Sequence, residues 1–314
     1  MVTGGAGFIG THVVRALLAL GADVCCVDRD PPRPTGGERA GLSAVQVDLT
    51  RPGAVEETVT AGIDAVVHLA AVTSVLGSRQ HPALTYETNV GVTARLLEQA
   101  RRLGTPRVVL ASTNAVVGDA GGAVIDERSV LRPLTPYGAT KAAAEMLLGA
   151  WAASYGLGGV ALRLTNVYGP GMHTKDSVVA RLMRAAATDT GFDVYGDGAQ
   201  VRDYVHVADV TAAVVRALSP GGPGPAWDGP VVIGSGRSTA VVDLLGRVRA
   251  VTGAAIPVRH VAAQAGEMPA VVVDVGRAAE LGWRPTVELD AGLRQVWAAW
   301  PAPERSELVA TPGS

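Results

Sequence analysis

Tyr137 and Lys141 lie four residues apart in the segment Tyr137-Gly-Ala-Thr-Lys141, and Lys141 is one of only two lysines in a chain of 314 residues. On a helix this spacing places both side chains on one face, where they can act together. A tyrosine with its ordinary pKa of about 10 is a poor base at neutral pH, but a nearby cation stabilises the phenolate and lowers that pKa. The pair is therefore a candidate acid/base site. The same spacing also arises by chance, so its meaning depends on what else the chain carries.

The glycine-rich segment 2–10 predicts a dinucleotide-binding turn between a strand and a helix. Gly4, Gly7 and Gly10 place no side chain between the backbone and a pyrophosphate, which can then approach the N-terminus of the helix. The candidate cofactor-binding residues of this turn are Gly4, Gly7, Phe8, Ile9 and Gly10.

A second apolar run, residues 22–27, ends at Asp28, eighteen residues after Gly10. An acid here is placed to accept hydrogen bonds from the adenosine ribose hydroxyls and to repel a 2′-phosphate, so it predicts NAD rather than NADP. Arg29 weakens this preference without reversing it. The alternative interpretation is a glycine-rich turn in another α/β protein, with Asp28 a solvated strand end.

The first strand is unusually short, because only Val2 precedes the glycine turn. A central parallel strand usually has about five residues. We therefore expect the natural start to lie upstream of Met1, or the chain to be truncated.

The composition excludes several classes of protein. Hydrophobic residues make up 48% and charged residues 18%, which favours a full globular core over disorder. A net charge of −2 predicts neither a nucleic-acid nor a membrane partner, and we find no transmembrane stretch or signal peptide. Cys25 and Cys26 are adjacent in an apolar run, and the six histidines form no ligand-spaced cluster. We expect a cytoplasmic α/β protein with no metal.

Apolar strand-like runs alternate with helical ones along the chain. The strand-like runs are 44–47, 65–69, 107–110 and 160–164, and helices are expected over 88–103 and 139–155. This alternation predicts an α/β fold, a Rossmann-type doubly wound parallel sheet with a smaller interleaved C-terminal substrate domain. We expect an NAD-binding domain over 1–165, rejoined by about 204–236, a substrate-binding domain over 166–203 and 237–300, and a mobile tail over 301–314.

Two further strand ends contribute candidate cofactor-binding residues. Asp48 and Leu49 are placed to reach the adenine edge. Leu69, Ala70 and Ala71 close the fourth strand, where the pyrophosphate is expected.

Taken together, the motifs of this chain resemble those of the extended short-chain dehydrogenase/reductase family, in its sugar-nucleotide epimerase/dehydratase branch. They occur in family order and cover nearly the whole chain. The matching segments are Thr3–Gly10, His68–Ala71, Ser112-Thr113, Tyr137-x-x-x-Lys141, Arg163–Gly171, Val194–Gly198, Arg202–Val207, Ile233–Gly236 and Leu281–Pro285.

The resemblance implies roles for particular residues. Tyr137 is the expected catalytic acid/base, and Lys141 is expected to bind the nicotinamide ribose and depress the pKa of the tyrosine. Thr113 is expected to bond the reacting sugar oxygen, with Ser112 beside it. Asn166 and Arg202 are expected to hold the substrate diphosphate, although a surface ion pair between Arg202 and Asp203 is the alternative. Asn89 and His206 also match motif positions, with Asn89 a candidate cofactor contact, but local packing or capping explains each about as well.

The resemblance also implies the reaction. The tyrosinate takes the proton of a sugar hydroxyl while hydride passes from that carbon to NAD, and the keto-sugar stays bound. In the 4,6-dehydratases an Asp and a Glu follow the catalytic threonine, and in the decarboxylases a Glu stands at the second position. This chain has Asn114 and Ala115 there. With no second acid/base, the simplest chemistry is 4-epimerisation of a UDP-sugar.

Two departures from the family pattern, and one pair of basic residues, concern the substrate. Val117 stands where a tyrosine is usual, and Gln264 stands where many relatives have an arginine near the nucleotide. His173 and Lys175 are placed to meet a C6 carboxylate, which would favour UDP-glucuronic acid over UDP-glucose. A solvated basic loop is the alternative interpretation of these two residues.

Two other functions stay open at this point: a net oxidoreductase or 4-ketoreductase that exchanges cofactor each cycle, and a silent member that only binds NAD.

The resemblance also implies a homodimer in which helices 88–103 and 139–155 pair with those of a second copy. Small side chains that allow such close approach are Ala142, Ala143, Ala144 and Ala150.

Overall fold

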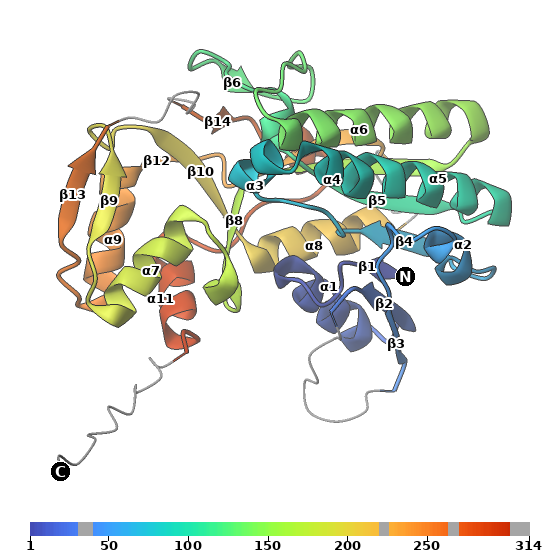
Figure 1. Cartoon of the computed structure of the whole chain (residues 1–314), viewed down its shortest axis with the longest axis horizontal. Helices are drawn as coiled ribbons and strands as arrows, with labels where there is room; N and C mark the ends of the chain where they lie inside the picture. The colour runs from blue at the N-terminus through green and yellow to red at the C-terminus, as the bar shows by residue number, and fades with distance from the viewer. Residues whose placement is uncertain (31–39, 220–225, 263–269, 302–314) are drawn as a thin grey trace, which may run out of the picture.

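The computed structural model describes residues 1–30, 40–219, 226–262 and 270–301 (Figure 1). Its centre is a seven-stranded sheet in the order β11-β7-β5-β4-β1-β2-β3, and every neighbouring pair is parallel. The strands are β1 Val2–Thr3, β2 Val24–Asp28, β3 Leu42–Gln46, β4 Ala65–His68, β5 Arg107–Thr113, β7 Gly158–Leu164 and β11 Gly229–Ile233. This order winds outward in both directions from the β1–β4 pair, so it confirms the predicted doubly wound sheet.

Helices cover both faces of the sheet, and the strands supply an apolar layer to each. In β5, Val109 packs in the core below α1 Phe8–Ala19 and α8 Val207–Leu218, whereas Val108 and Leu110 pack in the core of the other face. That second face is covered by α2 Ala54–Thr58, α5 Val92–Leu103 and α6 Pro136–Tyr155. Consecutive strand residues point to opposite faces, so a strand buried on both sides is apolar throughout.

A separate core lies beyond the sheet, on the left of Figure 1. Its helices are α7 Val178–Thr188, α9 Val241–Thr252 and α11 Leu289–Ala298, and its strands include β9 Phe192–Tyr195, paired with β13 Val258–Val261. A three-stranded sheet joins this part to the main sheet, in the order β12 Ser238–Ala240, β10 Val201–His206 and β8 Asn166–Tyr168.

Short elements complete the described chain. They are α3 Val75–Gln80, α4 Pro82–Tyr86, the π-helical turn η1 Glu87–Gly91, the 3₁₀ turns η2 Asn114–Val116 and η3 Met172–Thr174, the strand pair β6 Val124–Ile125 and β14 Val272–Val273, and α10 Gly276–Glu280.

Several expectations can be compared directly with these elements. The helix expected over 88–103 is a π-helical turn followed by α5, and the strand expected at 44–47 is β3, shifted two residues earlier at its start. β11, from the range expected to rejoin the NAD-binding part, pairs with β7 in the main sheet. The division into domains otherwise stays a proposal, and the expected mobile tail lies, from residue 302, outside the described residues.

β1 has only two residues, as its sequence predicts, yet it lies at the centre of the sheet. Strand-like pairing continues through Met1, whose amino group donates to the Ala65 carbonyl at 2.9 Å and whose carbonyl accepts from Val67 at 2.9 Å. The expected upstream start of the chain stays a prediction.

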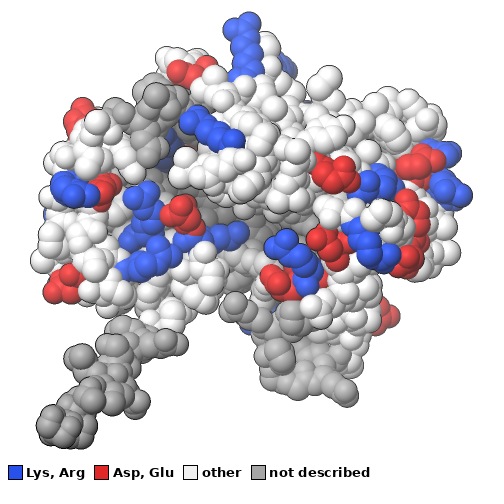
Figure 2. Space-filling model, in the orientation of Figure 1, with Lys and Arg blue, Asp and Glu red and all other residues white. Residues whose placement is uncertain are grey.

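No helix in the described ranges is long and apolar enough to span a membrane. The same ranges hold no group of three or more His, Cys, Asp or Glu side chains suited to a metal ion. Acidic and basic side chains are interspersed on the face shown in Figure 2.

Candidate active site

The glycine turn packs so tightly that side chains are excluded from it. Gly4 has a φ of +71°, and a Cβ there would lie 2.6 Å from the Ala70 nitrogen. A Cβ on Gly10 would lie 2.1 Å from the Gly4 carbonyl oxygen. The turn therefore needs glycine at both positions for the chain's own packing.

The turn also leaves the N-terminus of α1 uncapped. Gly7 is the N-cap residue and supplies no side-chain cap, and no acidic residue lies in the first turn. The free N–H groups and the helix dipole at this end favour an anion. Phe8 and Ile9 are half-buried in the first turn of the helix, and Phe8 packs against the separate core beyond the sheet.

Asp28, at the end of β2, has a second role that the sequence did not reveal. One carboxylate oxygen accepts the backbone N–H of Ala6 at 2.9 Å, and the other accepts that of Asp30 at 3.1 Å. The acid expected to bind the ribose thus also holds the glycine turn, and each oxygen retains a lone pair for a ligand.

At the end of β4, His68 is a buried neutral side chain. Its Nδ1 lies 2.7 Å from the Thr3 hydroxyl and its Nε2 lies 3.0 Å from the Thr93 hydroxyl. Thr93 donates to the Asn89 carbonyl at 2.7 Å, so His68 Nε2 must donate to Thr93 and Nδ1 must accept from Thr3. Burial, with a smaller effect of Lys141, lowers the pKa of His68 to about 3.

Asn89 binds the protein rather than leaving its amide open to a ligand. Its Oδ1 accepts the N–H of Val72, and its Nδ2 donates to the Val72 carbonyl and to the Thr140 hydroxyl. Thr140 in turn donates to the carbonyl of Tyr137 at 2.9 Å. Both donor hydrogens are used, so packing explains this residue better than the expected cofactor contact.

The remaining expected cofactor residues differ in whether they lie beside the glycine turn. Leu69 donates its N–H to the Thr3 carbonyl at 3.0 Å, which places Leu69, Ala70 and Ala71 beside the glycine turn. Asp48 is exposed and accepts from the Thr50 side chain and N–H, whereas Leu49 is buried in the core. The side chain of Leu49 therefore packs in the core, and the roles of Asp48 and Leu49 at the adenine stay proposals.

Tyr137 and Thr113 meet where α6 begins beside the end of β5. Tyr137 is half-buried at the first turn of α6, which Thr135 caps by accepting the Gly138 N–H. Burial raises the pKa of Tyr137, and a hydrogen bond with the Thr113 side chain opposes this effect by lowering it. The pKa of Tyr137 is thus raised in the chain alone, whereas the resemblance implies a depressed one.

Lys141 is buried one turn further along the same face of α6. Its ammonium donates to the Ala111 carbonyl at 2.8 Å. Burial lowers the pKa of Lys141 to about 8, and the Glu145 carboxylate raises it. The ammonium therefore bonds to the backbone of β5, on the helix face that Lys141 shares with the predicted acid/base.

Ser112, expected near the substrate, is buried within the protein. Its hydroxyl donates to Glu145, a buried residue of α6 that also pairs with Arg163 of β7 at 2.9 Å. Glu145 was not among the residues expected at the site, and Arg163 was named only as the first residue of a matching segment. The signal for Glu145 was its position four residues after Lys141, which puts both on one helix face.

The residues expected to hold a diphosphate lie on the three-stranded sheet. Asn166 of β8 is exposed, donates to the Asp203 carbonyl at 2.9 Å and lies opposite Tyr204 of β10, two residues after Arg202. Asp203 itself is fully buried, and its carboxylate accepts from Thr165, Ser235 and Arg237. This sheet lies off the carboxyl ends of the main strands, because Thr165 directly follows Leu164, the partner of Thr113.

His173 and Lys175 lie in and just after η3, and both are half-buried. Arg184 of α7 donates to the carbonyls of both residues, at 2.9 and 3.1 Å. Burial lowers the pKa of Lys175, and its side chain has no carboxylate partner within the described ranges. Gln264, the other expected substrate contact, lies outside the described residues.

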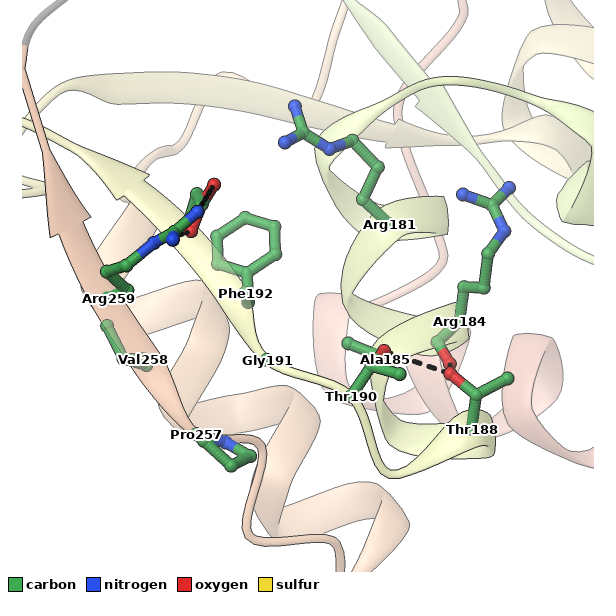
Figure 3. Close-up of a pocket in the computed structure, with 11 residues that line it drawn as sticks. Arg181, Arg184, Ala185, Thr188, Thr190, Gly191, Phe192, Pro257, Val258 and Arg259 are labelled. Atoms are coloured by element: carbon green, nitrogen blue, oxygen red, sulfur yellow. Dashed lines mark hydrogen bonds and ion pairs between the residues drawn. The ribbon is translucent and has the colours of Figure 1, made fainter.

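A cavity of about 740 Å³ opens between α7 and the β9–β13 pair, and Arg184 forms part of its wall (Figure 3). Arg181 lies over the Phe192 ring at 5.6 Å, and Arg259 pairs with Asp193 at 2.8 Å. None of the candidate catalytic residues lines this cavity.

The residues present fit a dinucleotide at the β1–α1 turn. Gly4 and Gly10 leave backbone where a Cβ would collide, the N-terminus of α1 has no cap, and Asp28 ends the neighbouring strand. Open sheets of this kind bind ligands outside the carboxyl ends of their strands. Thr3, His68 and Thr113 end three neighbouring strands at that edge.

Comparisons with known proteins agree with this geometry. A sequence model of the NAD dependent epimerase/dehydratase family matches residues 1–228. A UDP-glucose 4-epimerase from Streptomyces lividans is 33% identical over 318 residues, which cover 96% of this chain and 94% of that protein. The structure of MoeE5 in complex with UDP-glucuronic acid and NAD is similar with a TM-score of 0.86 and 36% identity, covering 95% of this chain and 97% of that one. DesIV, a dTDP-glucose 4,6-dehydratase from Streptomyces venezuelae with NAD bound, has a TM-score of 0.84 and 33% identity over 95% of both chains.

Proposed function

The chain belongs to the NAD dependent epimerase/dehydratase family, and on this premise we propose that it is a nucleotide-sugar 4-epimerase for UDP-glucose or UDP-glucuronic acid. NAD is the cofactor of the family and is bound in similar structures. The names of the similar proteins include both epimerases and dehydratases, so the choice between these reactions depends on the chain's own residues.

One arrangement carries the proposal: the Thr113 side chain lies close enough to Tyr137 to lower the pKa of its hydroxyl, and the two residues that follow Thr113 are Asn114 and Ala115. Tyr137 can exchange one proton with a sugar hydroxyl. An amide and a methyl group cannot exchange a second, which elimination of water would need. The nearest additional carboxylate on α6, Glu145, is buried in an ion pair. A reaction with a single acid/base is therefore favoured.

Epimerisation at C4 needs only that single group. Tyr137 accepts the proton of the C4 hydroxyl as this carbon is oxidised and returns it when the carbon is reduced from the other face. Thr113 is placed to orient the reacting oxygen through its hydroxyl. The NAD that the family binds supplies the hydride acceptor and donor for this reversible oxidation.

The raised pKa of Tyr137 has a consequence for the resting enzyme. Tyr137 carries its proton at neutral pH, so it must lose that proton before it can act as a base. The Lys141 ammonium is positioned on the same face of α6 to stabilise the phenolate. We propose that the tyrosinate forms only with cofactor and substrate bound.

For the substrate, we propose that Arg202 and Asn166 bind the diphosphate. Asn166 is exposed and lies on the strand next to that of Arg202, opposite a residue two positions further on, and an arginine makes charge-assisted hydrogen bonds to phosphate oxygens. Half-buried Lys175, which has no carboxylate partner in the described part of the chain, supports a substrate with its own carboxylate. This observation is the reason to include UDP-glucuronic acid, which has a C6 carboxylate, as the second candidate substrate.

The deciding experiment is to incubate the protein with NAD and, separately, UDP-glucose, UDP-glucuronic acid or UDP-N-acetylglucosamine. Products are read by proton NMR, and NADH absorbance is followed in the same samples. A C4 epimer without net NADH supports the proposal and identifies the sugar. Net NADH or a 4-keto product would instead assign an oxidoreductase or 4-ketoreductase.

We also propose that the protein is a homodimer in which α5 and α6 pair with those of a second copy, and the support for this lies on α6. Its outer face carries Ala139, Ala143, Met146, Ala150 and Ala153, at alternating spacings of four and three residues. Such an apolar stripe is typical of a packed helix pair. Ala142 and Ala144, two alanines expected at the interface, are buried within the chain's own core. Ala143 and Ala150 thus support the proposal, and the other two do not.

A further inference from the structure

Three residues on one face of α6 face three consecutive residues at the end of β5, and two of them are hydrogen-bonded to these residues. Lys141 donates to the Ala111 carbonyl and Glu145 accepts from the Ser112 hydroxyl, and the third pair is Tyr137 with the Thr113 side chain, which lowers the pKa of the tyrosine. Two of these pairs involve the candidate catalytic residues of α6. The third, at Glu145, has no part in the proton transfer described above.

Besides its hydrogen bond with Ser112, Glu145 makes a bidentate ion pair with a buried arginine. Arg163 donates from Nε to both carboxylate oxygens, at 3.2 and 3.1 Å, and from Nη2 to one of them at 2.9 Å. Arg163 Nη1 is bound at 3.3 Å by the carbonyls of Asp126 and Glu127. Both charged side chains are almost inaccessible, with 4% of Arg163 and 7% of Glu145 exposed.

Joining a helix to a strand through a buried ion pair has a high cost in desolvation free energy. Removing two charges from water costs several kcal/mol for each ion, and apolar side chains of similar volume often stabilise a fold as well or better. Stability alone is therefore a weak explanation for this pair. Its bidentate geometry instead fixes where one helix face lies relative to a strand end.

We propose that Glu145 is a positioning residue of the Tyr137 and Lys141 site: through Arg163 and Ser112 it fixes the face of α6 against the end of β5. This inference rests on the proposed function for its catalytic meaning, but its structural part can be measured without a substrate. Tyr137 precedes Glu145 by eight residues and Lys141 precedes it by four, so all three share the anchored face.

The pair also sets the electrostatic surroundings of Lys141. Among the described residues, the titratable and charged groups around Lys141 are Tyr137 and Glu145 on its own helix, His68 on β4 and Arg163 behind Glu145 on β7. His68 is neutral, so the charge balance near Lys141 depends on Glu145 and Arg163. Loss of the Glu145 charge leaves two cations together, whereas loss of the Arg163 charge leaves an anion facing Lys141.

The effect of these charges on Lys141 can be measured directly by NMR, because the chain contains only two lysines, Lys141 and Lys175. Protein labelled with ¹³C,¹⁵N-lysine gives two sets of side-chain resonances, which Lys175→Gln assigns. A pH titration of the folded protein, without cofactor or substrate, then gives the pKa of Lys141.

The two single variants have opposite expected effects. Glu145→Gln should lower the pKa of Lys141 below its starting value of about 8, and Arg163→Gln should raise it, each by about half a unit or more. A merely structural role would destabilise both variants in the same sense without moving this pKa in opposite directions. Glu98→Gln, which breaks the 2.7 Å surface pair with Arg101, is the matched control and should leave it unchanged.

A folded Glu145→Gln protein whose Lys141 titrates like the wild type would overturn the proposal. If either single variant fails to fold, the double variant Glu145→Gln/Arg163→Gln removes both buried charges and avoids an unpaired ion. It should fold and turn over substrate at least about tenfold more slowly, with KM changed less than about twofold. Wild-type turnover in the double variant would equally contradict the positioning role.

The inference and the proposed function fail in different ways. A wild-type protein that turns over none of the three UDP-sugars contradicts the proposed function, while the lysine titration still reports on Glu145. A wild-type epimerase with unmoved lysine titrations in all variants contradicts the inference alone.

Discussion

The carboxylate of Asp28 accepts the backbone N–H of Ala6 at 2.9 Å, so the acid that ends β2 also holds the glycine turn of β1 and α1. A negative charge at this strand end repels a ribose 2′-phosphate, while the hydrogen bond keeps the turn in place. In our proposal, the choice of cofactor and the geometry of the turn therefore depend on one side chain.

Asp28→Asn is expected to weaken NAD binding and to reduce the preference for NAD over NADP by about tenfold, because the charge is lost and one N–H loses its acceptor. The dissociation constants of both cofactors, measured by calorimetry, test this. Asp23→Asn, an exposed position just before the opposite end of β2, is the control. An unchanged preference in Asp28→Asn would remove Asp28 from the discrimination.

Tyr137→Phe is expected to lower kcat by about 10²- to 10⁴-fold while leaving the folded state and cofactor binding nearly unchanged, because only the proton-transferring hydroxyl is removed. Turnover of the sugar identified by proton NMR is the measurement. Tyr155→Phe removes an exposed hydroxyl at the other end of the same helix and should keep full activity. Equal activities of the two variants would refute the catalytic assignment.

The stability of the protein is expected to fall on acidification because of His68. Its pKa is about 3 in the folded chain against an ordinary value of 6.5, so between these values the unfolded chain binds a proton that the folded chain does not. This contribution is present above about pH 6.5 and is lost as the pH falls, by about 1.4 kcal/mol between pH 7.5 and 5.5.

Urea unfolding of the wild type and of His68→Gln at these two pH values tests the assignment. The variant should be less stable at pH 7.5 but should lose about 1.4 kcal/mol less on acidification. His260→Gln, on exposed β13, provides the control. The same pH dependence in all three proteins would show that His68 does not carry it.

Lys175→Gln separates the two candidate substrates. If Lys175 meets a C6 carboxylate, the variant should lose about ten- to a hundredfold in kcat/KM for UDP-glucuronic acid, the worth of a charge-assisted hydrogen bond, and less than about twofold for UDP-glucose. The two sugars measured on one protein control each other. Equal losses with both would assign Lys175 to the solvated basic loop or to the loop's structure.

Met146→Glu is expected to give a monomer, because it places a charge in the middle of the apolar stripe on α6, where Met146 is 69% exposed. Light scattering at micromolar concentration is the measurement. Leu20→Glu, a substitution of equal kind at a residue 68% exposed beyond α1, should leave the mass unchanged. A wild-type protein that is already a monomer would refute the dimer itself.

Much of the fold could be predicted because it depends on local periodicity. Apolar runs of strand length, separated by helical ones, predict a parallel sheet wherever they occur, and glycines at 4, 7 and 10 predict the turn that the close contacts of Gly4 and Gly10 require. The exact ends of the helices were less predictable. The π-helical turn before α5 interrupts a helix whose pattern is continuous.

The candidate site was only partly predictable from spacing. The sequence alone placed Tyr137, Lys141 and, unnoticed, Glu145 on one helix face, because four-residue intervals determine that face. It could not show which distant residues each helix face contacts in the folded protein. Asn89 matches a cofactor motif, yet its amide bonds to Val72 and Thr140, the latter fifty-one residues away along the chain.

By itself, then, the sequence determined the strand and helix types, the glycine turn and the identity of the groups able to transfer a proton. Only the tertiary structure decided their environments. The buried pair of Glu145 and Arg163, the neutral state of His68 and the raised pKa of Tyr137 depend on contacts between distant segments. Burial and charge act through space over a few ångströms, and sequence separation carries no information about that distance.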